Sequence, residues 1–302
     1  MKIAIHGLGR MGGQIVQKLA ESKEIKVIAH NRSPEPIVKA EGYGAIAAYS
    51  KDDVLKEFGD DQLILWIMLP ADVTDDQLNE WLKIIPKDSI IIDGGNSDFR
   101  LTRERNKLVK NQGSILIDIG VSGGIWGYQN GFSMMCGSDD EQTFKKIKPV
   151  LDILSGPEGQ YAYFGPSGSG HFVKMTHNAI EYGIMESLAE GYRLLKEGPY
   201  QNLDLDKAAD VWQHHSVITS WLNELVLDIV KENPNLDGIE GKVAQSGEAL
   251  WALETAKDLG IDMPAIDLSL KIRLDSQNGQ INYATKLLAA MRNKFGGHQI
   301  NV

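Results

Sequence analysis

An α/β domain built on a doubly wound, mostly parallel sheet, followed by an all-helical domain, is the fold class that the sequence predicts. Short β-branched runs alternate with helical stretches through the first half, which is typical of a parallel sheet. From about Gly170 to Arg292 no convincing strand occurs. The length of 302 residues suits two domains of roughly 150 residues each.

Strands are expected in the first half wherever a short, apolar, β-branched run occurs. The expected strands are Lys2–His6, Lys26–His30, Leu63–Leu69, Ser89–Asp93, Ile115–Asp118 and Phe132–Cys136. Helices are expected between them, most clearly at Gln14–Ser22, Asp72–Ile85 and Asp98–Asn111. In the first of these helices, apolar residues recur at helical spacing.

The second half begins with a long helix, expected at His171–Lys196 and about 39 Å long at 1.5 Å per residue. Further helices are expected at Leu205–Glu232, Lys242–Asp258 and Met263–Ser276. The loop Gly165–Gly170 contains only Gly, Ser and Pro, which is typical of a hinge. This loop predicts two domains, residues 1–167 and residues 168–302.

Composition and charge exclude several classes of protein. Hydrophobic residues make up 42% and charged residues 24%, as in ordinary globular proteins. Lys and Arg total 31 and Asp and Glu total 41, so the net charge is −10. Such a chain lacks the basic excess needed for broad binding to nucleic acid or anionic membranes. A small anion could still bind where a few cations converge.

Cysteine content and targeting signals bear on the compartment. Cys136 is the only cysteine, so neither an intrachain disulfide nor a cysteine zinc site can form. The start, Met1–His6, is strand-like and lacks the apolar core of a signal peptide. The apolar run Leu63–Leu69 is far shorter than the ~20 residues of a membrane span. A cytoplasmic protein is therefore expected.

A glycine loop lies between the first expected strand and the first expected helix. In this setting the pattern Gly7-x-Gly9-x-x-Gly12 indicates a Rossmann-type dinucleotide-binding domain. The glycines permit a tight turn, close approach of a pyrophosphate, and close packing of helix on strand. The alternative is a purely structural turn. The expected cofactor contacts are Gly7, Leu8, Gly9, Arg10, Met11, Gly12, Asn31, Arg32, Ser33, Leu69, Pro70 and Ala71.

The residues after the second expected strand, Asn31-Arg32-Ser33, indicate which cofactor is used. NAD enzymes usually place a carboxylate here, which accepts a hydrogen bond from the ribose 2′-hydroxyl. This segment has no carboxylate, and the guanidinium of Arg32 could pair with a 2′-phosphate. NADP is therefore favoured, although use of NAD as well is physically easy. The alternative is that Arg32 only faces solvent.

One face of the long helix carries five hydrogen-bonding side chains. At 100° per residue, Lys174, His177, Asn178, Glu181 and Tyr182 span an arc of about 140°. Such a set could form a catalytic site in the cleft between the two domains. The opposite side, which suits packing, holds Thr176, Ala179, Ile180, Gly183 and Ile184. The alternative is that Lys174 and Glu181 belong to a solvated face.

Several motifs occur in order along nearly the whole chain. They are Gly7–Gly12, Asp93–Ser97, Gly120–Gly124, Gly170–Glu186, and Arg292 with Phe295–His298. Together they resemble the 6-phosphogluconate dehydrogenase family of the pentose phosphate pathway, within the β-hydroxyacid dehydrogenase superfamily. The length is similar to that of the short form of the family, which lacks a long C-terminal extension.

The resemblance implies roles for individual residues. Lys174 corresponds to a general base, which must be neutral to take the proton from the 3-hydroxyl, and Glu181 to the acid that protonates C1 of an enediol. Substrate contacts are implied for Asn96, Ser122, Gly123, Gly124, His177, Asn178, Tyr182, Arg273, Arg292 and His298. Within that set, Tyr182, Arg273 and Arg292 correspond to phosphate ligands, and residues 122–124 to the loop that holds the carboxylate end. The resemblance also makes Asn96 a cofactor contact, because it implies a place near both the nicotinamide and the substrate.

The implied reaction oxidises 6-phosphogluconate at C3, releases carbon dioxide and leaves ribulose 5-phosphate, with reduction of NADP or NAD and no metal. One departure concerns a phosphate-binding lysine that larger family members carry before a tryptophan. Here the segment Ser246–Trp251 contains Glu248 and no lysine, and Lys242 is out of register. One phosphate contact is therefore open. The adjacent pair His214-His215 is not expected to bind metal, because neighbouring helical side chains point about 100° apart.

Two other functions remain open. A β-hydroxyacid dehydrogenase that acts on a small unphosphorylated hydroxy acid would share the glycine loop, Lys174 and Asn178. A non-catalytic nucleotide-binding or redox-sensing module would not need Lys174. The resemblance also implies a homodimer or homotetramer in which the tail with His298 completes a neighbouring site, and a fully active monomer would contradict this. No nucleic acid or membrane partner is expected.

Overall fold

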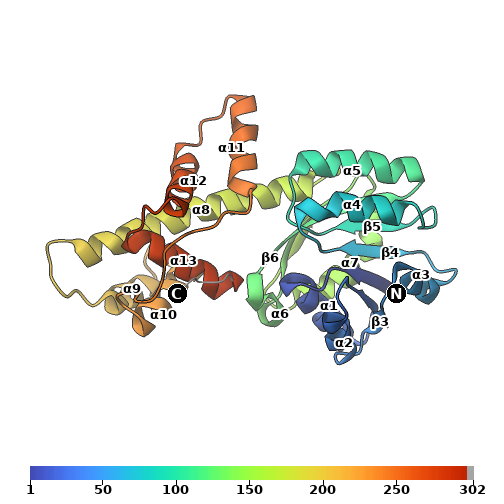
Figure 1. The fold of residues 1–302 in the computed structure, drawn as a ribbon, viewed down its shortest axis with the longest axis horizontal. Coiled ribbons are helices and arrows are strands. Elements are labelled where there is room, and N and C mark those ends of the chain that lie inside the picture. The colour runs from blue at the N-terminus through green and yellow to red at the C-terminus, as the bar shows by residue number, and fades with distance from the viewer. Residues whose placement is uncertain (298–302) are drawn as a thin grey trace. The chain divides into compact units, whose positions relative to one another are not determined.

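The computed structural model describes residues 1–297, and the chain forms two compact units that meet between Met175 and Thr176. The first unit is an α/β domain and the second is helical (Figure 1). The boundary lies inside one long helix, α8 (Ser169–Glu197), which therefore contributes residues to both units. No helix in the described part of the chain is both long enough and apolar enough to cross a membrane.

A single eight-stranded sheet forms the first unit, in the order β3-β2-β1-β4-β5-β6-β7-β8. The strands are β1 (Lys2–His6), β2 (Lys26–His30), β3 (Ile46–Ala48), β4 (Ile64–Ile67), β5 (Ile90–Asp93), β6 (Ile115–Ser122), β7 (Ser133–Gly137) and β8 (Tyr161–Tyr163). All neighbouring strands are parallel except β6 and β7. The chain order reverses between β1 and β4, the position where open α/β sheets bind ligands. The expected doubly wound, mostly parallel sheet is confirmed.

Helices cover both faces of this sheet. They are α1 (Arg10–Ser22), α2 (Pro34–Glu41), α3 (Lys51–Phe58), α4 (Ala71–Leu82), α5 (Phe99–Gln112), the 3-10 turn η1 (Gly124–Trp126), α6 (Gly127–Asn130) and α7 (Glu141–Ser155). Alternate residues of a strand pack on opposite faces: in β5, Ile90 and Ile92 pack with Ile15 of α1, whereas Ile91 packs with Trp81 of α4. Burial on both faces explains why these strands are continuous apolar runs rather than alternating ones.

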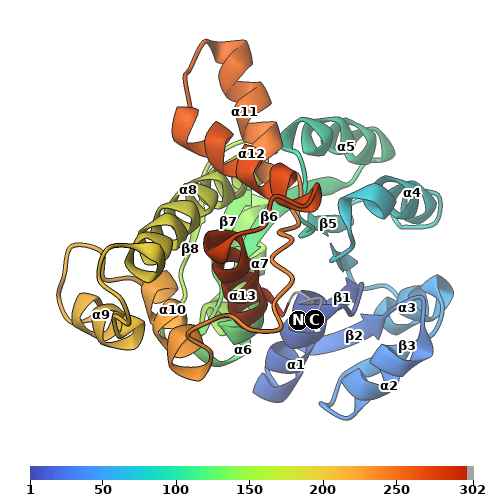
Figure 2. The ribbon, with the colours of Figure 1, turned by 60° about the vertical axis from the view of Figure 1, so that its left-hand side comes forward.

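Six helices make up the described part of the second half: α8, α9 (Leu205–Gln213), α10 (Trp221–Glu232), α11 (Glu248–Leu259), α12 (Pro264–Gln277) and α13 (Tyr283–Gly296). The main core joins Tyr192 of α8, Val226 of α10 and Leu287 of α13, all fully buried. A smaller cluster joins Tyr182 of α8 to α11 and α12, which lie side by side in Figure 2. No strand is found among the described residues of this half, as expected.

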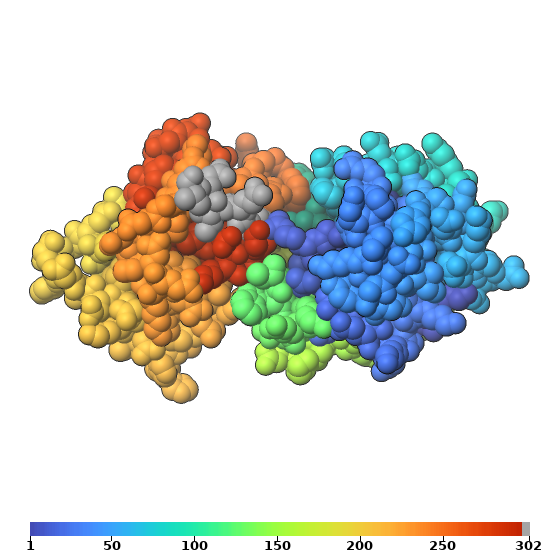
Figure 3. Space-filling model, turned by 60° about the horizontal axis from the view of Figure 1, so that its bottom comes forward, coloured from blue at the N-terminus to red at the C-terminus, as the bar shows by residue number. Residues whose placement is uncertain are grey.

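Two of the expected helices are wrong in extent. The stretch Leu205–Glu232 forms two helices rather than one, because the chain turns at His215 (φ 60°) and Ser220 then caps α10 by accepting a hydrogen bond from the backbone N–H of Asn223 at 3.1 Å. The surface of α9, α10 and the segment between them runs from yellow to orange in Figure 3. The helix expected from Lys242 begins only at Glu248, after Gly247 in a left-handed conformation.

One expectation about packing is also only half right. On the side of α8 assigned to packing, Ala179 is fully buried, but Ile180 is 51% exposed and Ile184 is 45% exposed.

The short strands β3 and β8, with three residues each, were not predicted from the sequence, because their runs are too short to show alternation.

Two buried histidines close the ends of β1 and β2. His6 and His30 have ring centroids 4.7 Å apart, and Trp81 donates its indole N–H to Nδ1 of His6 at 3.0 Å. His30 donates through Nδ1 to the carbonyl of Ala48 at 2.9 Å. Burial, with a contribution from His30, lowers the pKa of His6 to about 3, and burial lowers the pKa of His30 as well. The ring of His6 is therefore neutral at pH 7.

Stability should fall as the pH is lowered from about 6.5 towards 3. The pKa of His6 is lower in the folded than in the unfolded protein, so the unfolded state takes up protons first and is favoured. Each such group contributes a slope of up to about 1.4 kcal/mol per pH unit within that window. Urea unfolding at pH 7, 6 and 5 measures this slope.

The matched variant His6→Asn keeps an acceptor for the indole N–H of Trp81 and removes the titration. It should show a shallower slope between pH 6.5 and 5 than the parent protein. Equal slopes for the two proteins would contradict the assignment to His6.

Candidate active site

The glycine loop joins β1 to α1 in the geometry that a dinucleotide site requires. Gly7 has φ +104°, and a Cβ there would lie 2.4 Å from the carbonyl oxygen of Met68. A Cβ on Gly12 would lie 2.0 Å from the carbonyl oxygen of Gly7. Beside Gly9, in contrast, no atom of the described chain lies within 4 Å of the Cβ position. Two glycines therefore close the turn, and the third leaves its backbone open to a ligand.

The first turn of α1 suits an anion. Its N-cap residue, Gly9, has no side chain that could satisfy the helix N–H groups, and the first turn contains no acidic residue. Free N–H groups and the positive end of the helix dipole bind phosphate at such positions. The residues present therefore fit a dinucleotide pyrophosphate.

Three other expected cofactor segments follow the carboxyl ends of neighbouring strands. Asn31, after β2, accepts a hydrogen bond from the backbone N–H of Leu8 at 3.1 Å and so ties this segment to the glycine loop. Leu69-Pro70-Ala71 follows β4, and a Cβ on Gly95, after β5, would lie 2.5 Å from the carbonyl oxygen of Leu69. The structure thus packs these expected segments against one another, and the side chain of Arg32 is exposed.

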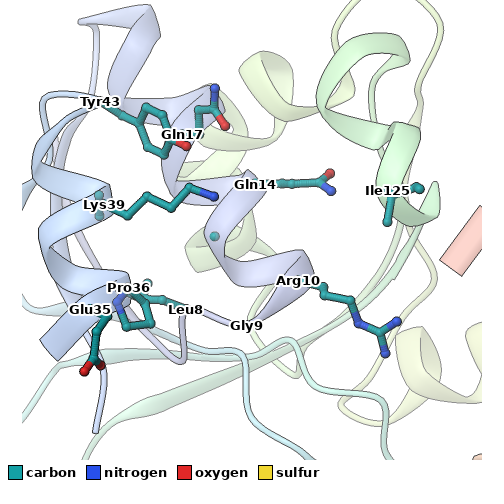
Figure 4. A pocket seen from close by; sticks show the side chains of 12 residues that line it. Leu8, Gly9, Arg10, Gln14, Gln17, Glu35, Pro36, Lys39, Tyr43 and Ile125 are labelled. Atoms are coloured by element: carbon teal, nitrogen blue, oxygen red, sulfur yellow. The ribbon is translucent and has the colours of Figure 1, made fainter. Parts of the chain in front are cut away.

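A cavity of about 550 Å³ opens beside the glycine loop. Figure 4 shows Arg10 and Gln14 of α1 on one side, and Lys39 of α2 with Tyr43 from the turn after α2 on the other. Arg32 does not line this cavity. Sequence reasoning missed the lining residues of α2, because only tertiary packing places that helix beside α1.

Asn96 lies on a loop that is held by a buried ion-pair network. Arg105 of α5 donates through Nη1 to Asp93 at 2.9 Å and to the hydroxyl of Ser97 at 2.6 Å, and through Nε to Asp75 of α4 at 2.5 Å. Arg105 and Asp93 are each only 2% exposed, whereas Asn96 is exposed. Asp93 and Ser97 therefore hold the loop in place and present Asn96 to solvent. Arg105 was not identified from the sequence.

Lys174 is positioned by an unusually close approach of α8 to β6. A Cβ on Gly120 of β6 would lie 2.2 Å from the Cβ of Lys174, and the lysine is 9% exposed. Asp118, also on β6, accepts hydrogen bonds from the backbone N–H groups of Gly168 at 2.7 Å and His171 at 2.9 Å. Burial raises the pKa of the Asp118 carboxyl, against the lowering effect of His171 and these N–H donors. Asp118 therefore caps the start of α8 from a strand.

The end of β6 carries the three residues expected to hold a carboxylate. Gly123 and Gly124 have φ values of +127° and +54°, a backbone region that favours glycine. Ser122, which precedes them, is partly buried. The turn expected to hold the carboxylate therefore depends on two glycines.

In the second unit, a chain of hydrogen bonds links three polar residues. Asn178 donates through Nδ2 to Oε1 of Glu248 at 2.6 Å, and its Oδ1 lies 2.9 Å from Nδ1 of His177. His177, Asn178 and Glu181 are partly buried, whereas Glu248 is 1% exposed. Glu248 is thus part of this polar cluster. Lys242, which was out of register, instead forms an ion pair with Glu240.

Buried cations form the other half of this cluster. The guanidinium carbon of Arg273 lies 3.3 Å from the centre of the Tyr182 ring, and Arg273 is 1% exposed. Nε of Arg273 has no hydrogen-bond partner among the described residues, and Arg292 is 8% exposed. Burial lowers the pKa of Arg273, Tyr182 opposes that effect, and the charge of Arg292 adds to it. Two mutually repelling buried cations, one with an unpaired donor, are what an anion would stabilise.

A buried acid borders these cations. Burial, with a contribution from Glu190, raises the pKa of Glu186 to about 7, and Arg273 opposes the shift.

His298 lies outside the described residues, so the expectation that the tail completes a neighbouring site stays a prediction. Within residues 1–297 there is no group of three His, Cys, Asp or Glu side chains that could hold a metal ion.

A dinucleotide-binding α/β unit is followed by a helical unit, and α8, which contributes to both, carries a lysine, an amide and a carboxylate on one face. This is the architecture of an NAD(P)-dependent dehydrogenase. The NAD binding domain of 6-phosphogluconate dehydrogenase matches residues 2–165, and the 6-phosphogluconate dehydrogenase C-terminal domain matches residues 170–302. The chain belongs to the 6-phosphogluconate dehydrogenase family.

Relatives of similar length support this assignment. The chain is 36% identical over 301 residues to YqeC of Bacillus subtilis, a protein to which 6-phosphogluconate dehydrogenase activity is ascribed by inference. That alignment covers 99% of this chain and 98% of YqeC. The chain is 34% identical over 303 residues to an NAD(+)-dependent, decarboxylating 6-phosphogluconate dehydrogenase of Haloferax volcanii, with the same coverage. A solved 6-phosphogluconate dehydrogenase of Plasmodium falciparum superposes with a TM-score of 0.78 at 26% identity, covering 96% of this chain and 70% of that one.

The same fold also occurs with a different named substrate. A 3-hydroxyisobutyrate dehydrogenase of Mycobacterium tuberculosis superposes with a TM-score of 0.74 at 19% identity, covering 95% of this chain and 97% of that one. At this identity the likeness concerns the fold alone, so the substrate has to be argued from the site.

Replacement of Gly120 by alanine should displace Lys174. The new Cβ would lie 2.2 Å from the Cβ of Lys174, so α8 or β6 must shift. Overpacking of this kind typically costs about 1–3 kcal/mol of stability. A displacement of about 1 Å at a reacting group can lower the rate roughly 100-fold. Dehydrogenase turnover and urea unfolding of Gly120→Ala measure the two effects.

The control is Gly191→Ala, also on α8, where no atom of the described chain lies within 4 Å of the new Cβ. This variant should keep its activity and its stability. If Gly120→Ala retained full turnover, the close packing would not position the lysine.

Proposed function

We propose that the protein catalyses the oxidative decarboxylation of 6-phosphogluconate to ribulose 5-phosphate and carbon dioxide. The observation that carries this proposal is the pair of buried guanidinium groups, Arg273 and Arg292, with Tyr182 stacked on the first. The planar fork of arginine matches phosphate oxygens. An unphosphorylated hydroxy acid whose carboxylate is held at residues 122–124 has no second anionic group for this site. The names of the relatives agree with a phosphorylated sugar acid.

The cofactor, when bound at Gly7–Gly12, supplies the nicotinamide ring that accepts hydride from C3 of the substrate. Lys174, as the neutral amine, takes the proton from the 3-hydroxyl, so that a 3-keto acid forms. The resulting ammonium polarises the new carbonyl, the bond from C2 to the carboxylate breaks, and carbon dioxide leaves. Glu181 then donates a proton to C1 of the five-carbon enediol, which becomes the ketose. Burial of Lys174 limits competing proton exchange with water.

The remaining residues orient the substrate in this proposal. Ser122, Gly123 and Gly124 hold the carboxylate, Asn96 lies near the nicotinamide, and His177 and Asn178 bind hydroxyl groups. Arg273, Arg292 and Tyr182 hold the phosphate. Because Glu248 is an anion, it cannot supply the phosphate contact that a lysine makes in larger family members.

Steady-state kinetics with 6-phosphogluconate and with 3-hydroxyisobutyrate test the substrate. Turnover of the phosphorylated acid with release of one carbon dioxide per reduced cofactor is expected. Lys174→Met should lower kcat about 100- to 10,000-fold, the range of a general base. Lys196→Met, an exposed lysine on the same helix, should not. Turnover of 3-hydroxyisobutyrate alone would favour the rival dehydrogenase, and full activity of Lys174→Met would remove the assigned base.

We propose that NADP is preferred over NAD. No carboxylate stands at residues 31–33, and the exposed Arg32 is available to a 2′-phosphate. One charge-assisted hydrogen bond is worth about 1.5–3 kcal/mol, so Arg32→Ala should weaken NADP binding roughly 10- to 100-fold and leave NAD binding nearly unchanged.

Arg10→Ala is the matched control for this measurement, because Arg10 lies in the glycine loop and should affect both cofactors alike. Dissociation constants from fluorescence titration decide between the two outcomes. Equal losses for NADP and NAD in Arg32→Ala would exclude a 2′-phosphate contact.

A further inference from the structure

Glu248 is a buried carboxylate in the segment where larger family members carry a phosphate-binding lysine. Its surroundings indicate a different task. It is 1% exposed and is the first residue of α11. Its Oε1 accepts a hydrogen bond from Nδ2 of Asn178 at 2.6 Å. The partner of this carboxylate is thus the residue expected to bind the substrate, and both belong to the second unit.

The local backbone brings Glu248 to α8. Gly247 has φ +102°, and a Cβ there would lie 2.5 Å from the ring of Trp251. The backbone N–H of Ser246 donates to the hydroxyl of Tyr182 at 3.4 Å, which ties this loop to α8. The carboxylate then sits at the positive end of the α11 dipole, which stabilises its charge. Figure 2 shows α8 and α11 in this unit.

The hydrogen-bonding rules of an amide fix the direction of the hydrogen bonds that link Glu248, Asn178 and His177. An asparagine side chain has a donor end, Nδ2, and an acceptor end, Oδ1. An ionised carboxylate only accepts, so Asn178 must direct Nδ2 to Glu248. Oδ1 of Asn178 then faces Nδ1 of His177 at 2.9 Å. Because Oδ1 only accepts, Nδ1 of His177 must carry a hydrogen.

The position of that hydrogen determines what His177 offers to a ligand. A neutral imidazole carries one proton, so a proton on Nδ1 makes Nε2 the acceptor nitrogen. A lysine at position 248 would donate to Oδ1 of Asn178, turn Nδ2 towards His177 and favour the other tautomer. The charge at position 248 therefore selects between two states of the histidine.

We propose that Glu248 is a positioning residue that, through Asn178, holds His177 in the tautomer protonated at Nδ1, so that Nε2 accepts a hydrogen bond from a substrate hydroxyl. The identity of that hydroxyl rests on the proposed function. The tautomer of the free protein does not.

The test is ¹⁵N NMR of histidine-labelled protein, with the ring signals of His177 assigned by their loss in His177→Gln. In the parent protein the neutral ring should carry its proton on Nδ1. In Glu248→Gln the new amide can present either end to Asn178, so both tautomers of His177 should be populated. Asp258→Asn, which removes an exposed carboxylate from the last turn of the same helix, should leave the tautomer unchanged.

A double variant provides rescue. In Glu248→Gln with Asn178→Asp, the carboxylate at position 178 accepts from the amide at position 248 and from Nδ1 of His177. The Nδ1 tautomer should therefore return. This return would show that an acceptor atom at position 178 is what holds the proton on Nδ1 of His177.

Kinetics give the functional readout. Glu248→Gln should lower kcat/KM for 6-phosphogluconate on the order of 10- to 100-fold, the loss typical of a group that orients a ligand-binding residue. Its urea midpoint should stay close to that of the parent. A proton on Nε2 in the parent protein, an unchanged Nδ1 tautomer in Glu248→Gln, or unchanged kcat/KM would each overturn the proposal. If 6-phosphogluconate were not a substrate, the tautomer measurement on the free protein would still decide the positioning role.

Discussion

The attachment of α8 to β6 is the constraint on which the proposed chemistry depends. A helix start leaves backbone N–H groups without partners, and here the buried carboxylate of Asp118 accepts two hydrogen bonds from residues at that start. The close approach is possible only because Gly120 has no Cβ. Since α8 is continuous over 29 residues, the side chains that follow Lys174 have fixed angular positions around its axis. One capped helix start therefore fixes where Lys174, the proposed base, lies relative to β6.

Buried charge is used in two different ways in this acidic protein. Arg105 is compensated by Asp93 and Asp75, and this network holds the loop that carries Asn96. Arg273 is instead stacked on Tyr182 beside a second buried cation, and its Nε lacks a partner in the described chain. The two sites differ in charge pairing: Arg105 faces two carboxylates, whereas Arg273 and Arg292 repel each other, and an anion would relieve that repulsion. The net charge of −10 is therefore compatible with a local anion site.

The fold was largely predictable because its signals are local. The runs that form β1 and β2 were predicted at the bounds observed, and the glycine loop lies between β1 and α1 as expected. The errors occur where local periodicity misleads. The stretch 205–232 was expected to be one helix, yet the left-handed residue His215 and the cap at Ser220 divide it. Gly247 delays α11 for a similar reason, because its positive φ cannot belong to the helix.

The sequence by itself determined the order of the elements, the glycine loop and the polar face of α8, because each depends on residues that are close along the chain. Only the tertiary structure decided which residues serve that face. Asp118, Gly120 and Arg105 act across distances of 12 to 54 residues along the chain, and Glu248 reaches Asn178 across 70. Such pairs leave no periodic signal, since contact between them arises only when the strands and helices pack. The sequence showed a carboxylate in place of a lysine, and the fold determined that its partner is an asparagine amide.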